Sequence, residues 1–332
     1  MMLMSCGDCL CCHQYARLLL TIGLTMGIGV MGGACGTPVA DRPLPTLVPT
    51  SIAASPQTPK PDDSHSQQTL RVYHIGNSLT DTLNYPLFQK LVERRGSRYI
   101  YGRHMIPGAP LAWIWEHPTD GFKEDPYGYY PTALPNYTWD VLTLQPSDRH
   151  IEGADGDLAM AKNYINLTQR QSPHLRVYIY ARWMHKHKDG SLEFDRRWLQ
   201  PYDTKVPGSE QGREFFERLV RDLRQAYPNA QDRIFLIPVG DVMYELNQRM
   251  KAGIVPGYNT IAQLYKDSAH LNDVGSYLVA ATFYATLYRD HPDGLEASIY
   301  GIEDPRLAAI IHQVVWNVVS THPLAGVSQF SQ

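Results

Sequence analysis

The clearest absence in this sequence of 332 residues is that of cysteine, which does not occur after position 35. The five cysteines are Cys6, Cys9, Cys11, Cys12 and Cys35. The remaining chain therefore carries neither a disulfide framework nor a cysteine nucleophile. An excess of one charge is also lacking, since 30 lysines and arginines stand against 33 aspartates and glutamates. No basic run is dense enough to follow a phosphate backbone, and we expect no nucleic acid partner.

The N-terminal residues 1–35 are predicted to be a targeting segment. Arg17 precedes an apolar run over 18–31, which has the length of a signal-peptide core and is too short and glycine-rich for a comfortable membrane span. The run ends in Gly-Gly-Ala-Cys35, which resembles a bacterial lipobox, although Gly32 stands where that motif usually has leucine. We expect Cys35 to be lipidated and the protein to be exported, anchored at the extracellular face of the membrane or in the periplasm. Soluble secretion and a retained membrane anchor remain open.

Residues 36–69 are rich in proline, threonine and serine and poor in aromatic residues. Such a composition cannot bury enough apolar surface to fold, so we expect a disordered linker. The folded domain is then predicted to cover residues 70–332.

From position 70 onward, short β-rich runs alternate with amphipathic stretches. Strands are expected at 70–75, 98–103, 141–145, 175–181 and 233–237, and helices at 85–94, 158–168, 210–226, 273–288 and 305–319. This alternation predicts an α/β fold in which helices cover both faces of a parallel sheet. We expect a three-layer α/β/α sandwich around a mostly parallel, five-stranded sheet.

Two short segments supply the groups that nucleophilic catalysis by a hydroxyl requires. Ser78 follows the first strand in Gly-Asn-Ser-Leu-Thr, and Asp267 precedes His270 by three residues in Asp-Ser-Ala-His. A serine hydroxyl attacks a carbonyl poorly unless a neutral imidazole removes its proton, and a carboxylate must hold that imidazole in one tautomer. Asp267 and His270 are close enough in sequence to face one another, so only Ser78 must arrive by tertiary folding.

These segments resemble the first and last motifs of the SGNH, or GDSL-type, esterases and lipases. The resemblance covers roughly residues 70 to 290 and implies an SGNH-hydrolase-like, flavodoxin-like fold with Ser78 as nucleophile and His270 and Asp267 completing a triad. It also implies an oxyanion hole built from the N–H groups of Ser78 and Gly108 and an asparagine. This chain has Gln145 where that asparagine is expected, either as a third donor or as a support for buried loop backbone. No cofactor or metal is expected.

The sequence also contains partial matches to the signatures of two other hydrolase classes. An α/β-hydrolase elbow requires Gly-x-Ser-x-Gly, and Thr80 stands in place of its second glycine. The segment that contains His185, His187 and Asp189 matches the start of a dinuclear zinc signature, but lysines lie between its ligands and Gly190 replaces the next histidine. A zinc-dependent hydrolase at His185, His187 and Asp189 remains an alternative.

An aromatic segment over 113–139 indicates a binding cleft. It includes Trp113 and Trp115, and aromatic rings stack on sugar faces and also on acyl chains. Because glycines, prolines and acidic residues lie among the rings in place of an aliphatic flap, a sugar is favoured over a lipid. Arg182 and Trp183 leave the end of a predicted strand and are expected to contact substrate as well. We expect an acylated carbohydrate or another small ester, with acetyl as the acyl group. Two readings stay open: the aromatic residues fill a loop core, or the protein is an inactive surface carbohydrate-binding protein on the same fold.

Overall fold

Strand β1 (Thr69–Gly76) begins one residue before the expected start of the folded domain. The structure is a computed structural model that describes residues 67–327. The expected targeting segment with Cys35 and nearly all of the expected linker lie outside the described residues. Across 67–327, no helix is long and apolar enough to cross a membrane.

The central sheet has six strands in the order β3-β2-β1-β4-β5-β6. The other strands are β2 (Arg98–Met105), β3 (Phe122–Lys123), β4 (Val141–Leu144), β5 (Arg176–Tyr180) and β6 (Ile234–Ile237). Only β3 runs antiparallel to its neighbour, and every other pair is parallel. The five expected strands all form, but the expected total of five is wrong. The edge strand β3 is only two residues long and leaves no periodic pattern in the sequence.

The order of the five parallel strands fixes where a ligand can reach the sheet. In chain order they lie second, first, third, fourth and fifth, which is the arrangement of flavodoxin-like sheets. Strands β4 and β6 consist of apolar residues and one threonine and are buried throughout, as expected for strands covered on both faces. The chain switches direction of winding between β1 and β4, and ligands of such sheets bind beyond the carboxyl ends of the strands at this point.

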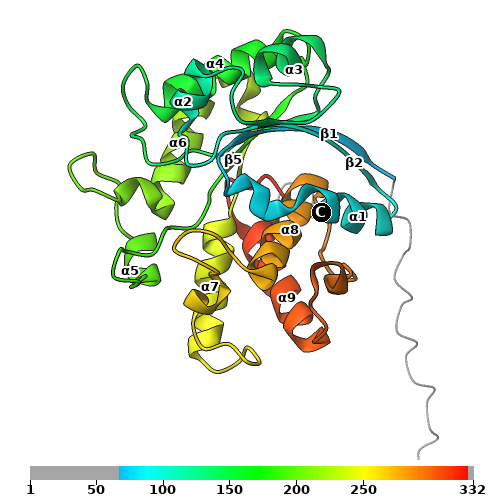
Figure 1. Ribbon diagram of the computed structural model, residues 1–332, viewed down its shortest axis with the longest axis vertical. Helices are drawn as coiled ribbons and strands as arrows, with labels where there is room; N and C mark the ends of the chain where they lie inside the picture. The colour runs from blue at the N-terminus through cyan, green and yellow to red at the C-terminus, as the bar shows by residue number, and fades with distance from the viewer. Residues whose placement is uncertain (1–66, 328–332) are drawn as a thin grey trace, which may run out of the picture. The chain divides into compact units, whose positions relative to one another are not determined.

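Helices flank the sheet. They are α1 (Tyr85–Arg94), α2 (Leu111–Glu116), α3 (Tyr130–Asn136), α4 (Asp157–Gln169), α5 (Phe194–Trp198), α6 (Arg213–Ala226), α7 (Val239–Lys251), α8 (Asp273–Tyr288) and α9 (Pro305–Thr321). Short 3-10 turns are η1 (Thr80–Leu83), η2 (Ser209–Gln211), η3 (Pro228–Arg233), η4 (Ile261–Leu264) and η5 (Ala297–Tyr300). In Figure 1, α2, α3 and α4 lie on one side of β1 and β2, and α1, α8 and α9 lie on the other.

The expected helices form with small shifts at their ends. The bounds of α1 and α8 agree with the sequence pattern, while α6 starts three residues later than expected. Helices α2, α3, α5 and α7 were not expected. Helix α7 follows β6 directly, with only Pro238 between the two elements.

The first turn of α7 packs tightly on a buried tryptophan. A Cβ atom at Gly240 would lie 2.0 Å from Cη2 of Trp198, whose side chain has no exposed surface. The Gly240 N–H also donates to the Ala181 carbonyl just beyond β5, at 3.0 Å. Both the ring and the backbone are fixed, so this contact has no flexible partner that can yield.

Replacing Gly240 by alanine should therefore destabilise the fold by about 1–3 kcal/mol, because the new methyl group overlaps the Trp198 ring. The free energy of unfolding in urea measures this loss. Glu245→Ala, at a partly exposed position on the same helix, should change it by no more than about 0.5 kcal/mol. Equal stability of the Gly240 variant would show that Trp198 is free to move.

Candidate active site

The structure brings Ser78, His270 and Asp267 together, although Ser78 and His270 are 192 residues apart in sequence. The Oγ atom of Ser78 lies 2.9 Å from Nε2 of His270. On the other side of the ring, Nδ1 of His270 lies 2.9 Å from Oδ2 of Asp267 and 3.2 Å from Oδ1. The three side chains thus form a continuous hydroxyl, imidazole and carboxylate chain.

A tight turn at the end of β1 positions Ser78. A Cβ atom at Gly76 would lie 2.6 Å from Thr80 and 2.7 Å from Cβ of Gln145, so only glycine allows this close approach. The Asn77 side chain accepts the Leu79 N–H, and the Thr80 hydroxyl donates to the Asn77 carbonyl. These local bonds fix the backbone on both sides of Ser78 and leave its hydroxyl at the partly exposed end of the strand.

Asp267 is held as an anion by the backbone of its own loop. Its Oδ1 atom accepts the N–H groups of Ala269 and His270, each at 2.7 Å. These bonds, led by that of His270, lower the pKa of Asp267 to about 2. An ionised carboxylate accepts only, so the proton between the two residues belongs to Nδ1 of His270. The Nε2 atom of the neutral ring therefore faces Ser78 as an acceptor.

The loop that carries Asp267 and His270 is closed at its base and supported from below. Lys266 N–H donates to the His270 carbonyl, and Asn272 N–H donates to the Leu264 carbonyl. Asn272 also caps α8, accepting the Gly275 N–H at 3.1 Å. From beneath, Nε1 of the buried Trp183 donates to the Ala269 carbonyl at 2.7 Å. The direction of the histidine ring is thus fixed by neighbours on three sides.

Two of the expected oxyanion donors are available. Among residues 67–327, no hydrogen bond uses the N–H of Ser78 or of Gly108. Gly108 is exposed and has a φ of +69°, a conformation that favours glycine. Gln145 is buried; its Oε1 accepts the Asn77 N–H at 3.0 Å, and its Nε2 donates to the Pro146 carbonyl. Gln145 thus supports the backbone that carries Ser78, and its second amide hydrogen remains for another acceptor.

Arg182 and Trp183 have no exposed side-chain surface, which corrects the expectation that they contact substrate. Arg182 donates to the Pro146 and Trp183 carbonyls and to Asp148. Both residues lie under the site and hold its loops. A position at the end of a strand was the only signal for them, and it does not reveal whether a side chain points outward.

The two expected tryptophans of the aromatic segment have different surroundings. Trp115 is partly buried and lies against Tyr130 and Tyr164, with ring centroids 5.1 Å away in both cases. It belongs to the packing between α2, α3 and α4. Trp113 is 47% exposed and stacks on His117. Only Trp113 of this pair presents a free aromatic face.

The residues of the zinc alternative do not converge. Nε2 of His185 is buried without a hydrogen-bond partner among the described residues, whereas His187 lies on an exposed loop 3.6 Å from Glu193. Asp189 accepts both the N–H and the hydroxyl of Ser191. Within 67–327, no group of three or more His, Cys, Asp or Glu side chains is arranged to hold a metal ion. The site at His185, His187 and Asp189 therefore has no structural support.

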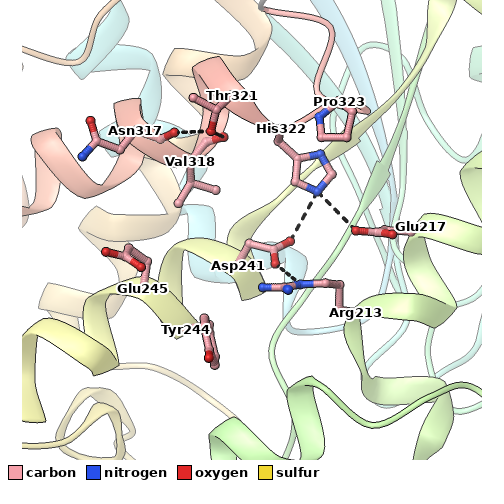
Figure 2. A pocket seen from close by; sticks show the side chains of 10 residues that line it. All are labelled: Arg213, Glu217, Asp241, Tyr244, Glu245, Asn317, Val318, Thr321, His322 and Pro323. Atoms are coloured by element: carbon pink, nitrogen blue, oxygen red, sulfur yellow. Dashed lines mark hydrogen bonds and ion pairs between the residues drawn. The ribbon is translucent and has the colours of Figure 1, made fainter.

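A cavity of about 440 Å³ lies away from these residues, between α6, α7 and the end of α9 (Figure 2). Its charged groups pair with one another: Arg213 donates to Asp241, and Nε2 of His322 lies 3.6 Å from Glu217 and 3.7 Å from Asp241. None of the three residues of the Ser78 site lines it. These ion pairs link α6, α7 and the end of α9.

No protein-family model matches this sequence, and no curated protein matches it. A solved structure of a DUF4886 family protein from Bacteroides uniformis is similar, with a TM-score of 0.51, 18% identity and coverage of 76% of this chain and 95% of the other. This likeness shows a shared fold. A Clostridium thermocellum family 3 carbohydrate esterase has a TM-score of 0.38 and 12% identity, covering 65% of this chain and 94% of its own. The periplasmic domain of a Salmonella ser. Paratyphi A lipopolysaccharide acetyltransferase has a TM-score of 0.37 and 14% identity, covering 66% and 84%. These last two likenesses are too weak to support an argument.

Proposed function

We propose that the protein is a serine esterase of the SGNH type, with its sheet and helices forming a three-layer sandwich, and that it hydrolyses carboxylic esters through an acyl-enzyme on Ser78. The observation that carries the proposal is the 2.9 Å contact between the Ser78 hydroxyl and an imidazole nitrogen that must be an acceptor. A hydroxyl in that contact has a base in place for the proton it loses on attack.

The proposed reaction has two steps. Ser78 Oγ attacks the ester carbonyl while Nε2 of His270 takes its proton, and Asp267 stabilises the imidazolium that forms. The N–H groups of Ser78 and Gly108, with Gln145 as a third donor, stabilise the oxyanion. His270 then returns the proton to the departing alcohol. Water attacks the acyl-enzyme by the same route and releases the acid.

The proposed substrate is an acetylated carbohydrate. The exposed ring of Trp113 supports this choice because aromatic faces stack on sugar rings, although the ring also suits other apolar groups. We further propose that the enzyme is exported and held at a membrane through a lipid on Cys35, which would place the esterase beside carbohydrate outside the cytoplasm. Soluble secretion remains the alternative.

A fluorophosphonate probe should label the wild-type protein, and Ser78→Ala should abolish labelling. The same variant should lower kcat/KM for p-nitrophenyl acetate by about a thousandfold or more, since it removes the hydroxyl that lies 2.9 Å from Nε2 of His270. Ser191→Ala, in an exposed loop, serves as the control and should retain full activity. Binding of a polysaccharide without labelling would favour the inactive carbohydrate-binding alternative, and loss of activity with EDTA would favour a metal enzyme.

The acid side of the pH profile should show a single ionisation. Asp267 has a lowered pKa of about 2, so its carboxylate stays ionised through the weakly acidic range and adds no second ionisation there. The logarithm of kcat/KM for p-nitrophenyl acetate should fall with a slope of one as the pH decreases. The stabilisation from Asp267 is present above the unfolded pKa of about 3.9 and is lost only as the pH falls toward 2. A slope of two above pH 4 would mean that Asp267 protonates early.

Trp183→Phe should lower kcat about tenfold with little change in KM, because loss of the indole N–H frees the Ala269 carbonyl and loosens the loop that carries His270. The matched control is Trp198→Phe, since Trp198 is equally buried and donates its indole N–H to Asp241. Stopped-flow or steady-state kinetics of both variants, with their melting temperatures, separates the roles. A similar loss of kcat in both would reduce the Trp183 effect to general destabilisation.

A further inference from the structure

Asp148 combines features that its role in folding does not require. It lies three residues beyond Gln145, in the loop after β4, with a left-handed φ of +54°. Its side chain is 48% exposed, while its ion-pair partner Arg182 is wholly buried. A carboxylate needed only to neutralise Arg182 would be satisfied without half of its surface in solvent.

The two oxygens of this carboxylate have different surroundings. Oδ1 accepts from Nη2 of Arg182 at 2.8 Å and from Nε2 of Gln211 at 2.9 Å. Oδ2 has only a long contact of 3.4 Å from the Ser147 hydroxyl among the described residues. One oxygen is therefore fully used in holding the side chain in place, and the other keeps its capacity to accept hydrogen bonds.

Arg182 keeps Asp148 rigid. Its Nη1 donates to the Trp183 carbonyl at 2.8 Å, and its Nε donates more weakly to the Pro146 carbonyl. A guanidinium bound at several points loses little further entropy when it orients a carboxylate. Asp148 is thus an acceptor whose direction is set before any ligand arrives.

The segment that holds Asp148 runs beside the His270 loop. Lys186 N–H donates to the Ser268 carbonyl at 2.8 Å, and the Tyr265 hydroxyl donates to the Met184 carbonyl. His185 lies near both Asp148 and His270, whose charges act on its ring. Its backbone N–H donates to Oε1 of Gln211. Burial lowers the pKa of His185 first, with Arg182 adding to the effect, so the ring is neutral near pH 7.

The net charge of the Arg182–Asp148 pair determines which kind of ligand group the free Oδ2 atom can bind. Asp148 lies 2.8 Å from the guanidinium of Arg182, so its carboxylate offsets the Arg182 charge and the Arg182–Asp148 pair is neutral as a whole. A neutral pair with a free acceptor oxygen matches a hydroxyl donor better than an ammonium group, which gains little from a carboxylate already neutralised.

We propose that Asp148 forms a subsite that accepts a hydrogen bond from a hydroxyl of the alcohol part of the ester. This subsite rests on the proposed esterase function and gives it selectivity for esters of sugars or other polyols over esters of simple or cationic alcohols. Asp148 binds and orients the leaving group and takes no part in proton transfer.

Asp148→Asn tests the subsite while preserving the shape of the side chain. The amide oxygen can still face Arg182 and Gln211, which places an NH₂ donor where Oδ2 accepted. With a mono-O-acetylated methyl glucoside, kcat/KM should fall by about 10- to 100-fold, the effect of losing a hydrogen bond to a charged acceptor. With p-nitrophenyl acetate, which has no hydroxyl, the rate should stay within about twofold. Asp189→Asn, on a nearby exposed loop, is the control and should change neither.

Three kinetic outcomes would overturn the subsite: an unchanged rate on the sugar ester, an equal fall on both esters, or a fall confined to acetylcholine, whose alcohol is cationic. Affinity for the acetylated methyl glucoside, measured by NMR titration of the wild-type and Asp148→Asn proteins, separates this proposal from the esterase function. A tenfold weaker affinity in the variant supports the subsite even in a protein that fails to hydrolyse or to label. Equal affinities, or no binding by either protein, would overturn it.

Discussion

The ionised carboxylate of Asp267 is the constraint on which the whole site depends. Its two short bonds from the Ala269 and His270 N–H groups keep it charged and fix its position relative to the ring that it must orient. Because the anion can only accept, it determines which nitrogen of His270 carries the proton, and hence that the nitrogen facing Ser78 is free to take one. The tautomer of His270 is thus set within the segment 267–270, and the remainder of the fold needs only to bring a serine to the correct nitrogen.

The order of the strands in the sheet places Ser78 at this site. Strands β1 and β4 are neighbours at the point where the winding reverses, so Ser78 and Gln145 follow adjacent strand ends although they are 67 positions apart in the sequence. Gln145 accepts the Asn77 N–H next to Ser78, and this hydrogen bond fixes the turn that follows β1. The SGNH-type resemblance expects an asparagine here. The longer amide of Gln145 reaches the end of the neighbouring strand, where its Oε1 accepts the Asn77 N–H at 3.0 Å.

Much of this arrangement could be predicted from sequence because it depends on local patterns. Short runs rich in β-branched, aromatic and other apolar residues predict the five parallel strands, and the spacing of Asp267 and His270 predicts a self-contained pair. The edge strand β3 and the short helices α2, α3 and α5 are fixed by tertiary contacts and leave no period to read. The direction of a side chain at a strand end is a tertiary property too. The strand pattern therefore locates Arg182 and Trp183 at the end of a strand, but the prediction that their side chains are exposed is wrong. The sequence contains no signal for Asp148, which Arg182 holds.

Arg182 and Trp183, which are buried beneath the site, hold two loops that are far apart in the sequence. Trp183 holds the Ala269 carbonyl of the histidine loop, and its neighbour Arg182 holds Asp148 and the Pro146 carbonyl next to Gln145. Adjacent residues of one segment thus hold the loop that carries His270 and the loop that supports Ser78. A buried guanidinium is costly unless every donor has a partner, so its presence ties the two loops into one arrangement. Under the proposed function, a change that releases one loop would disturb the other, and this coupling explains why a wholly buried arginine occurs beside a site whose triad requires no positive charge.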